Sequence, residues 1–133
     1  MLPVTWDSVR LTLHVLAATV WVGGQITLAA LVPALRRAAS EATKVAARRF
    51  AAIGWPAFAV LLATGIWNIV AVRDQTHGAY RSTLIVKLAV VALSGIAAAA
   101  HQRAKHPLAL ALSATLSALA SLTALFLGIL LTT

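Results

Sequence analysis

Apolar residues occupy four long runs along this chain, and polar residues gather between them. The runs cover about residues 9–35, 46–72, 83–102 and 107–131. Each run reaches the roughly 20 residues that an α-helix needs to cross a bilayer. The segment Arg-Asp-Gln-Thr-His-Gly at 73–78 separates the second run from the third and has the composition of a loop. The pattern predicts an all-α, integral membrane four-helix transmembrane bundle, formed as a single domain by residues 1–133.

Within the first three runs, the polar residues recur at helical spacing and so share one face of each predicted helix. A face turned toward lipid would not collect the polar residues of its span, so these faces are expected to line the bundle interior. They consist of His14, Ala18, Trp21 and Gln25; of Gly54, Phe58, Leu61, Gly65 and Asn68; and of Lys87, Val91, Ser94, Ala98 and His101.

The fourth run carries small residues at every fourth position. A stripe of this kind is smooth and allows close helix contact, so we expect packing from it and no chemistry. Its members are Ala109, Ser113, Ser117 and Ser121.

Composition supports a membrane location. The chain is 61% hydrophobic and only 11% charged, whereas soluble domains carry about 25% charged residues. The net charge of +8 comes from basic residues beside the apolar runs. Basic residues there set membrane orientation, so the lipid bilayer is the expected partner and nucleic acid is not.

The distribution of basic residues predicts the orientation. More of them lie in the segments after the first and third runs than at the opposite ends. Because positive charge favours the cytoplasmic side, we expect a multi-pass protein of the cell (inner) membrane with both termini outside. The inner group is Arg36, Arg37, Lys44, Arg48, Arg49, Arg103 and Lys105, and the outer group is Arg10, Arg73 and Arg81.

Two titratable residues, His14 and Lys87, lie inside apolar runs. A central Lys in a span costs roughly 2.5–3.5 kcal/mol on insertion scales, so such a residue marks a candidate functional site. Both should lie slightly below the outer surface, and Asn68 should lie at a similar depth. His101 should lie about 21 Å deeper than Lys87, at about 1.5 Å of rise per residue. His14 and His101 therefore do not easily serve one haem.

Several roles are open for these residues. His14 could bond to a neighbouring helix or act as the axial ligand of a haem iron. Lys87 could extend to the interface, or contact a haem propionate, an anionic substrate or a proton pathway in a catalytic role. Trp21 could pack on a flat cofactor or on other side chains.

The two remaining candidate ligands lie nearer the helix ends. His77, in the outer loop, could supply a second ligand beside His14 or simply be a solvated loop residue. His101 could be a solvated helix-end residue, because Gln102 and Arg103 follow it at once. It could otherwise belong to a second site that faces the cytoplasm.

Three segments carry a resemblance to a known membrane superfamily. The stretch from Leu13 to Gly24 is similar to the pattern LHxxAxxxWxGG of the copper-resistance D (CopD) family. Arg48-Arg49-Phe50 with Thr64-Gly65 resembles that family's next helix. HemJ-type protoporphyrinogen oxidases share this layout, to which Val86-Lys87-Leu88 and His101 are also similar. The resemblance covers about residues 9–103.

The resemblance implies a four-helix membrane bundle and two kinds of activity. HemJ-type proteins are associated with haem b and a porphyrinogen oxidation that uses a His and a Lys, to which His14 and Lys87 correspond. CopD-type proteins are linked to copper uptake or resistance. The implied function is a haem b-binding redox or electron-transfer protein with a quinone or another membrane redox partner, and a haem-dependent oxidoreductase is one form of it.

Two other functions stay open. Copper transport or resistance is one, although Cu(I) prefers thiolate and thioether ligands and the chain has no Cys and one Met. A purely structural role, as a homo-oligomer or a subunit of a larger membrane complex, is the other.

Overall fold

The computed structural model describes residues 3–75 and 77–133, and within them it contains helices and turns but no strand. Four helical segments are long and apolar enough to cross a membrane, which confirms the predicted all-α membrane fold. They are Trp6–Ala38, Ser40–Ala71, Ala79–Arg103 and Pro107–Leu130. The chain divides into two compact units, Met1–Arg73 and Asp74–Thr133. The predicted single transmembrane domain stays a prediction.

The first span is a continuous helical rod built from three elements. These are α1 (Trp6–Ala18), the π-helical turn η1 (Thr19–Gly23) and α2 (Gly24–Ala38). Thr5 caps the rod: its hydroxyl accepts a hydrogen bond from the Ser8 amide at 3.2 Å, and its amide donates to the Ser8 hydroxyl at 3.3 Å. The rod is therefore longer at both ends than the predicted span of 9–35.

The second span, α3 (Ser40–Ala71), follows after a single extended residue, Ala39, with φ −166° and ψ 120°. The composition of the segment at 36–49, with its many basic residues, suggests a loop. The structure places these basic residues near the ends of α2 and α3 instead. The physical reason is that Ala, Arg, Lys and Glu, which fill this segment, are all strong helix formers. Pro56 lies inside α3, and the helix continues through it.

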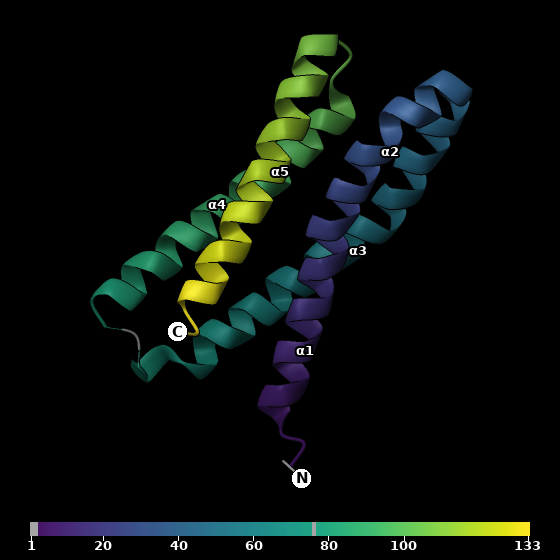
Figure 1. The fold of residues 1–133 in the computed structure, drawn as a ribbon. Helices are drawn as coiled ribbons and strands as arrows, with labels where there is room; N and C mark the ends of the chain where they lie inside the picture. Colours follow the sequence, from purple (N-terminus) through teal and green to yellow (C-terminus); the bar gives the residue numbers. More distant parts are fainter. Residues whose placement is uncertain (1–2, 76) are drawn as a thin grey trace. The chain divides into compact units, whose positions relative to one another are not determined.

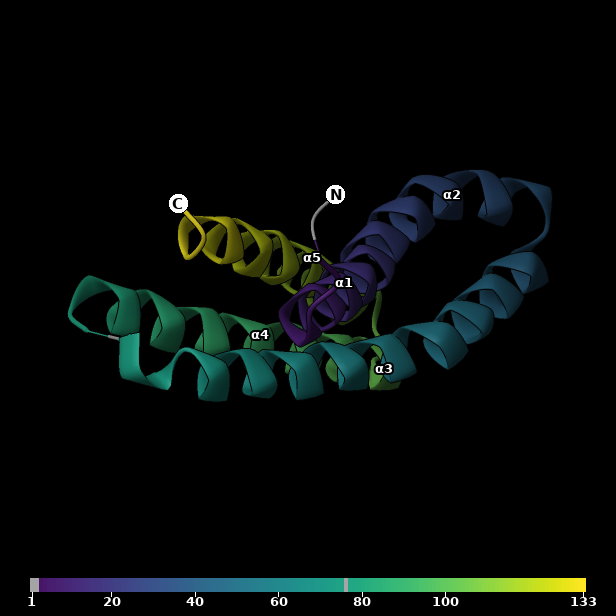
Figure 2. The same cartoon turned by 90° about the horizontal axis from the view of Figure 1, so that it is seen from below.

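In the first unit, the rod of α1 and α2 packs on α3, which lies alongside α2 and crosses α1 (Figures 1 and 2). An aromatic cluster supports the middle of this pair. The Trp21 ring centroid lies 4.5 Å from that of Phe58 and 5.5 Å from that of Trp55. Trp21 is only 3% exposed, so it is a central packing residue of the unit.

Further along the same pair, the Phe50 ring of α3 lies against two glycines. A Cβ atom on Gly24 would collide with this ring, and one on Gly54 would lie 3.3 Å from it. The close approach of α2 to α3 therefore needs a residue without a side chain at Gly24. At Gly54, which is on α3 like Phe50, the ring would have to shift by only a few tenths of an ångström. Gly23, by contrast, has open space where its Cβ would be.

The second unit is an antiparallel pair of α4 (Ala79–Arg103) and α5 (Pro107–Leu130), which lie side by side (Figure 1). It follows η2 (Arg73–Gln75), a short 3-10 turn. Gly78 has a φ of +54°, a conformation that favours glycine, at the entry to α4.

A serine cluster holds α4 and α5 together. The Ser94 hydroxyl lies 2.6 Å from that of Ser121, and the Ser117 hydroxyl donates to the Ser94 carbonyl at 3.0 Å. Ser121 donates in turn to the Ser117 carbonyl at 2.8 Å. All three residues are at most 3% exposed, so the predicted packing role of the small-residue stripe is confirmed for Ser117 and Ser121.

Candidate functional site

His14 lies on the face of α1 that packs against α3, where it meets Thr64. Its Nδ1 atom is 2.8 Å from the Thr64 hydroxyl oxygen. That hydroxyl donates its own proton to the Val60 carbonyl at 2.7 Å. Because a threonine hydroxyl has one proton to give, it must accept from His14. Nδ1 therefore carries a hydrogen, and in the neutral ring the lone pair is on Nε2.

This arrangement is the one in which histidines bind metals. A ligating histidine usually donates its other ring N–H to a neighbouring group, which fixes the tautomer and the ring orientation. Here Thr64, 5% exposed, is that group. The ring packs against α3 beside Gly65, where a Cβ would be in ordinary van der Waals contact at 3.6 Å from Cε1 of His14. The site can thus present a neutral imidazole in a fixed orientation.

Arg10 lies one turn before His14 on α1, and Asn68 lies one turn after Thr64 on α3. Arg10 was not among the expected site residues. Arg10 is only 7% exposed, and its Nη1 atom pairs with Asp7 at 3.1 Å. Its Nε atom and the Oδ1 atom of Asn68 are both buried and have no hydrogen-bond partner among the described residues. Asn68 therefore does lie in a polar part of the interior of the first unit, as its helical face predicted.

The sequence does contain a pattern that places Arg10 on the same helix face as His14. Arg10 precedes His14 by four residues, so it continues the stripe that contains His14 and Trp21. Sequence reasoning counted it only as an outer charge that sets orientation. Thr64 was noted for its resemblance to a family motif and was not assigned a role beside His14.

Lys87 belongs to the second unit, on the face of α4 that packs against α5. Its Nζ atom lies over Gly128, where an added Cβ would be 3.0 Å away. Gly128 is in the last turn of α5, and the carbonyl end of a helix favours a positive charge. Among the described residues Lys87 forms no hydrogen bond or ion pair. Its predicted pairing with His14, which joins the two units, stays a prediction.

The other predicted site residues have simpler surroundings. His101 is bonded across the helix pair, with Nδ1 2.9 Å from the Leu110 carbonyl and 3.3 Å from the Ser113 hydroxyl. It therefore ties α4 to α5 and is not merely solvated. His77 is exposed in the segment before α4. The predicted ligand roles of His77 and His101, and the predicted contact of Trp21 with a cofactor, stay predictions.

The described residues do not gather three or more His, Cys, Asp or Glu side chains that could hold a metal ion. A haem needs only one or two protein ligands, because the porphyrin supplies the others. A single histidine donor such as His14 meets that need.

Comparisons with protein-family models, with curated proteins and with solved structures gave no match.

Proposed function

We propose that this chain is a haem b-binding integral membrane protein with a redox or electron-transfer role, of the kind that the resemblance to CopD and HemJ proteins implies. The observation that carries the proposal is the hydrogen bond from His14 to Thr64. It orients a neutral imidazole with its lone pair on Nε2, inside a helix long and apolar enough to cross a membrane.

In this proposal the chain would position the haem, and the haem would supply one-electron chemistry. His14 would hold the iron, while Thr64 keeps the His14 ring from rotating. The contacts among Trp21, Trp55 and Phe58 hold the neighbouring part of α1 against α3. A rigid ligand lowers the reorganisation that accompanies each change in iron charge.

Lys87 is proposed to act on the polar edge of the same cofactor. The Lys87 amino group over Gly128 has no bonded partner among the described residues. As an ammonium it is available to a propionate or an anionic substrate, and as a neutral amine it can take up a proton. The donor or acceptor of electrons is proposed to be a membrane quinone or another membrane redox protein. We further propose the cell (inner) membrane as the location, with both termini outside.

The direct test is a reduced-minus-oxidised absorption spectrum of the protein purified after haem-replete expression. We expect a sharp b-type band for the wild type and its loss in His14→Ala. His106→Asn is the matched control: His106 caps α5 by accepting a bond from the Leu108 amide at 3.2 Å, and Asn caps equally well. Lys87→Met should keep the band position and lower the bound haem.

A wild-type spectrum without a b-type band would end the proposal and favour a structural subunit. Metal analysis of the same sample addresses copper. Copper ranks lower because its preferred thiolate and thioether ligands are nearly missing, with no Cys and one Met in the chain.

A further inference from the structure

A recess with two arginines in its wall lies on α3, near the end that follows the turn at Ala39. It has a volume of about 370 Å³ and is lined by Val45, Arg48, Arg49 and Ala52. This spacing places all four residues on one face of the helix. Phe50, whose ring lies against Gly24 of α2, points about 150° away around the helix. Because the four lining residues are also exposed, the recess is on a side of α3 that α2 leaves open.

The recess is positively charged, and the nearby acidic residue does not offset this charge. The carboxylate of Glu41 is paired with Lys44 at 2.8 Å, and the salt bridges of the described residues include neither Arg48 nor Arg49. Arg48 Nε donates to the Lys44 carbonyl at 3.4 Å. Because each guanidinium has five N–H donors, most donors of the two arginines remain for a ligand. The recess therefore favours an anion with several acceptor oxygens.

Membrane depth places this recess among the lipid headgroups. About 20 residues of helix cross the hydrocarbon layer, so a layer that ends at Ala71, the last residue of α3, begins near Ala52. Arg48 and Arg49 then lie about 5 Å beyond its edge, at about 1.5 Å per residue. The headgroups add roughly 5–7 Å on each side of the hydrocarbon. The two arginines are therefore at the depth of the lipid phosphates, and Ala52 is where the acyl chains begin.

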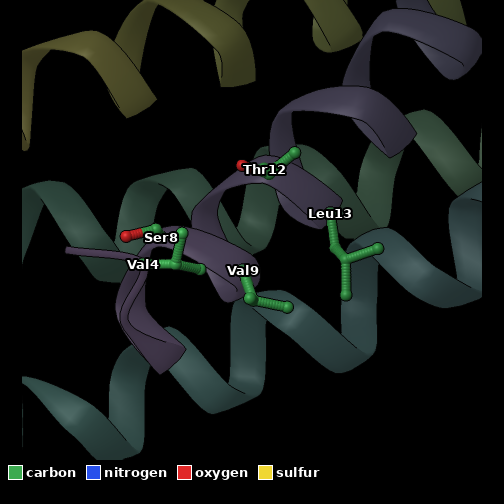
Figure 3. Close-up of a pocket in the computed structure, with 5 residues that line it drawn as sticks. All are labelled: Val4, Ser8, Val9, Thr12 and Leu13. Carbon is green, nitrogen blue, oxygen red and sulfur yellow. The ribbon is translucent and has the colours of Figure 1, made fainter. Parts of the chain in front are cut away.

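A second recess, on α1, has nearly the same size but different walls. Its volume is about 350 Å³. Its lining residues, drawn in Figure 3, are all uncharged: Val4, Ser8, Val9, Thr12 and Leu13. A recess of this size alone therefore gives no preference for a charged ligand, and the arginines are what distinguish the recess on α3.

We infer that the recess on α3 binds the phosphate of an anionic phospholipid from the leaflet that meets this end of the helix. Arg48 and Arg49 donate hydrogen bonds to the phosphate oxygens, because the planar guanidinium matches the geometry of phosphate. The first acyl carbons lie against Ala52. A zwitterionic lipid fits less well, since its ammonium group would meet the positive charge of the same arginines. This lipid site does not depend on a haem or on a redox role.

Native mass spectrometry of the full-length protein in a neutral detergent tests the site. The probes are phosphatidylglycerol and phosphatidylcholine of equal chain length. We expect one phosphatidylglycerol to bind at least about fivefold more tightly than phosphatidylcholine. Equal retention of the two lipids would overturn the inference.

Two double variants separate the recess from the general positive charge of this end of the unit. Arg48→Gln with Arg49→Gln should lower the affinity for phosphatidylglycerol about tenfold or more. Arg36→Gln with Arg37→Gln is the charge-matched control, at exposed arginines of α2 that do not line the recess. It should lower the affinity by less than about threefold. Equal losses would show a diffuse charge effect and would also overturn the inference.

Filling the recess without changing its charge gives a further arm. Ala52→Phe should weaken phosphatidylglycerol binding by roughly fivefold, because the acyl carbons lose their contact with the helix. Ala47→Phe adds the same ring at an exposed position of α3 outside the recess and should leave binding unchanged. Unchanged binding in Ala52→Phe would contradict the site. Displacement of the lipid by millimolar inorganic phosphate would assign the recess to a soluble anion and overturn the inference.

Discussion

The one proton of the Thr64 hydroxyl determines the chemistry available to His14. Since that proton is given to the Val60 carbonyl, Thr64 can only accept from the ring, and Nδ1 must donate. Because Thr64 accepts a hydrogen bond from Nδ1 and donates none to the ring, Nε2 is the basic atom of the neutral imidazole. Neither His14 nor Thr64 alone would fix the hydrogen on Nδ1 of the ring.

Thr64→Val should test this positioning role, because valine keeps the shape of threonine and removes the hydroxyl. We expect haem affinity to fall about tenfold or more, as it does when the outer partner of a metal-bound histidine is lost. Haem titration into haem-free protein measures the affinity, and a redox titration of the loaded protein should show a shifted potential. Thr64→Ser should restore both. Wild-type affinity in Thr64→Val would contradict the role.

At the scale of the helices, the apolar runs of the sequence are sufficient to predict the four spans. They do not predict the residues at which the helices begin and end. The segment at 36–49 is polar and so resembles a loop, yet its residues favour helix. The structure turns within Ala39 alone. Polarity indicates where the chain leaves the lipid, whereas local backbone preference decides where a helix stops.

The candidate site was partly predictable for a related reason. Helical spacing identified His14, Asn68 and Trp21 as inward-facing, because periodicity reports the face that a residue shares. It did not identify Arg10, whose charge suggested an orientation signal. The pairing of His14 with Thr64 depends on the register between two helices, which the sequence of either helix alone does not contain.

The two adjacent glycines of the first rod should respond differently to the same substitution. Gly24→Ala would place a Cβ against the Phe50 ring, which also lies close to Gly54. Overpacking of this kind costs about 1–3 kcal/mol. Gly23→Ala meets open space and should be neutral or stabilising, because Ala favours helix by about 1 kcal/mol over Gly. Unfolding titrations in SDS would measure the difference, and equal stabilities would refute it.

For the whole molecule, orientation in the membrane is the property that composition predicts most directly. Basic residues are concentrated at the joint between α2 and α3 and after α4. The positive-inside rule predicts that these ends face the cytoplasm. The segment before α4, with His77, would then face outward together with the termini.

Cysteine labelling should confirm this orientation, and the absence of natural Cys removes any background. We expect His77→Cys to react with a membrane-impermeant maleimide on intact cells. Ala39→Cys should react only after the membrane is permeabilised. The reverse pattern would show that the protein is inserted the other way, with its basic ends outside.

The single-residue turn at Ala39 has a practical consequence. The rod Trp6–Ala38 and the helix α3 are each about 50 Å long at about 1.5 Å per residue, whereas the hydrocarbon layer is about 30 Å thick. Part of this hairpin therefore extends beyond the lipid without a flexible connection. A helical reporter domain grafted at this turn would keep a fixed orientation, which would provide the alignment marker that electron cryomicroscopy needs for a chain of 13.9 kDa.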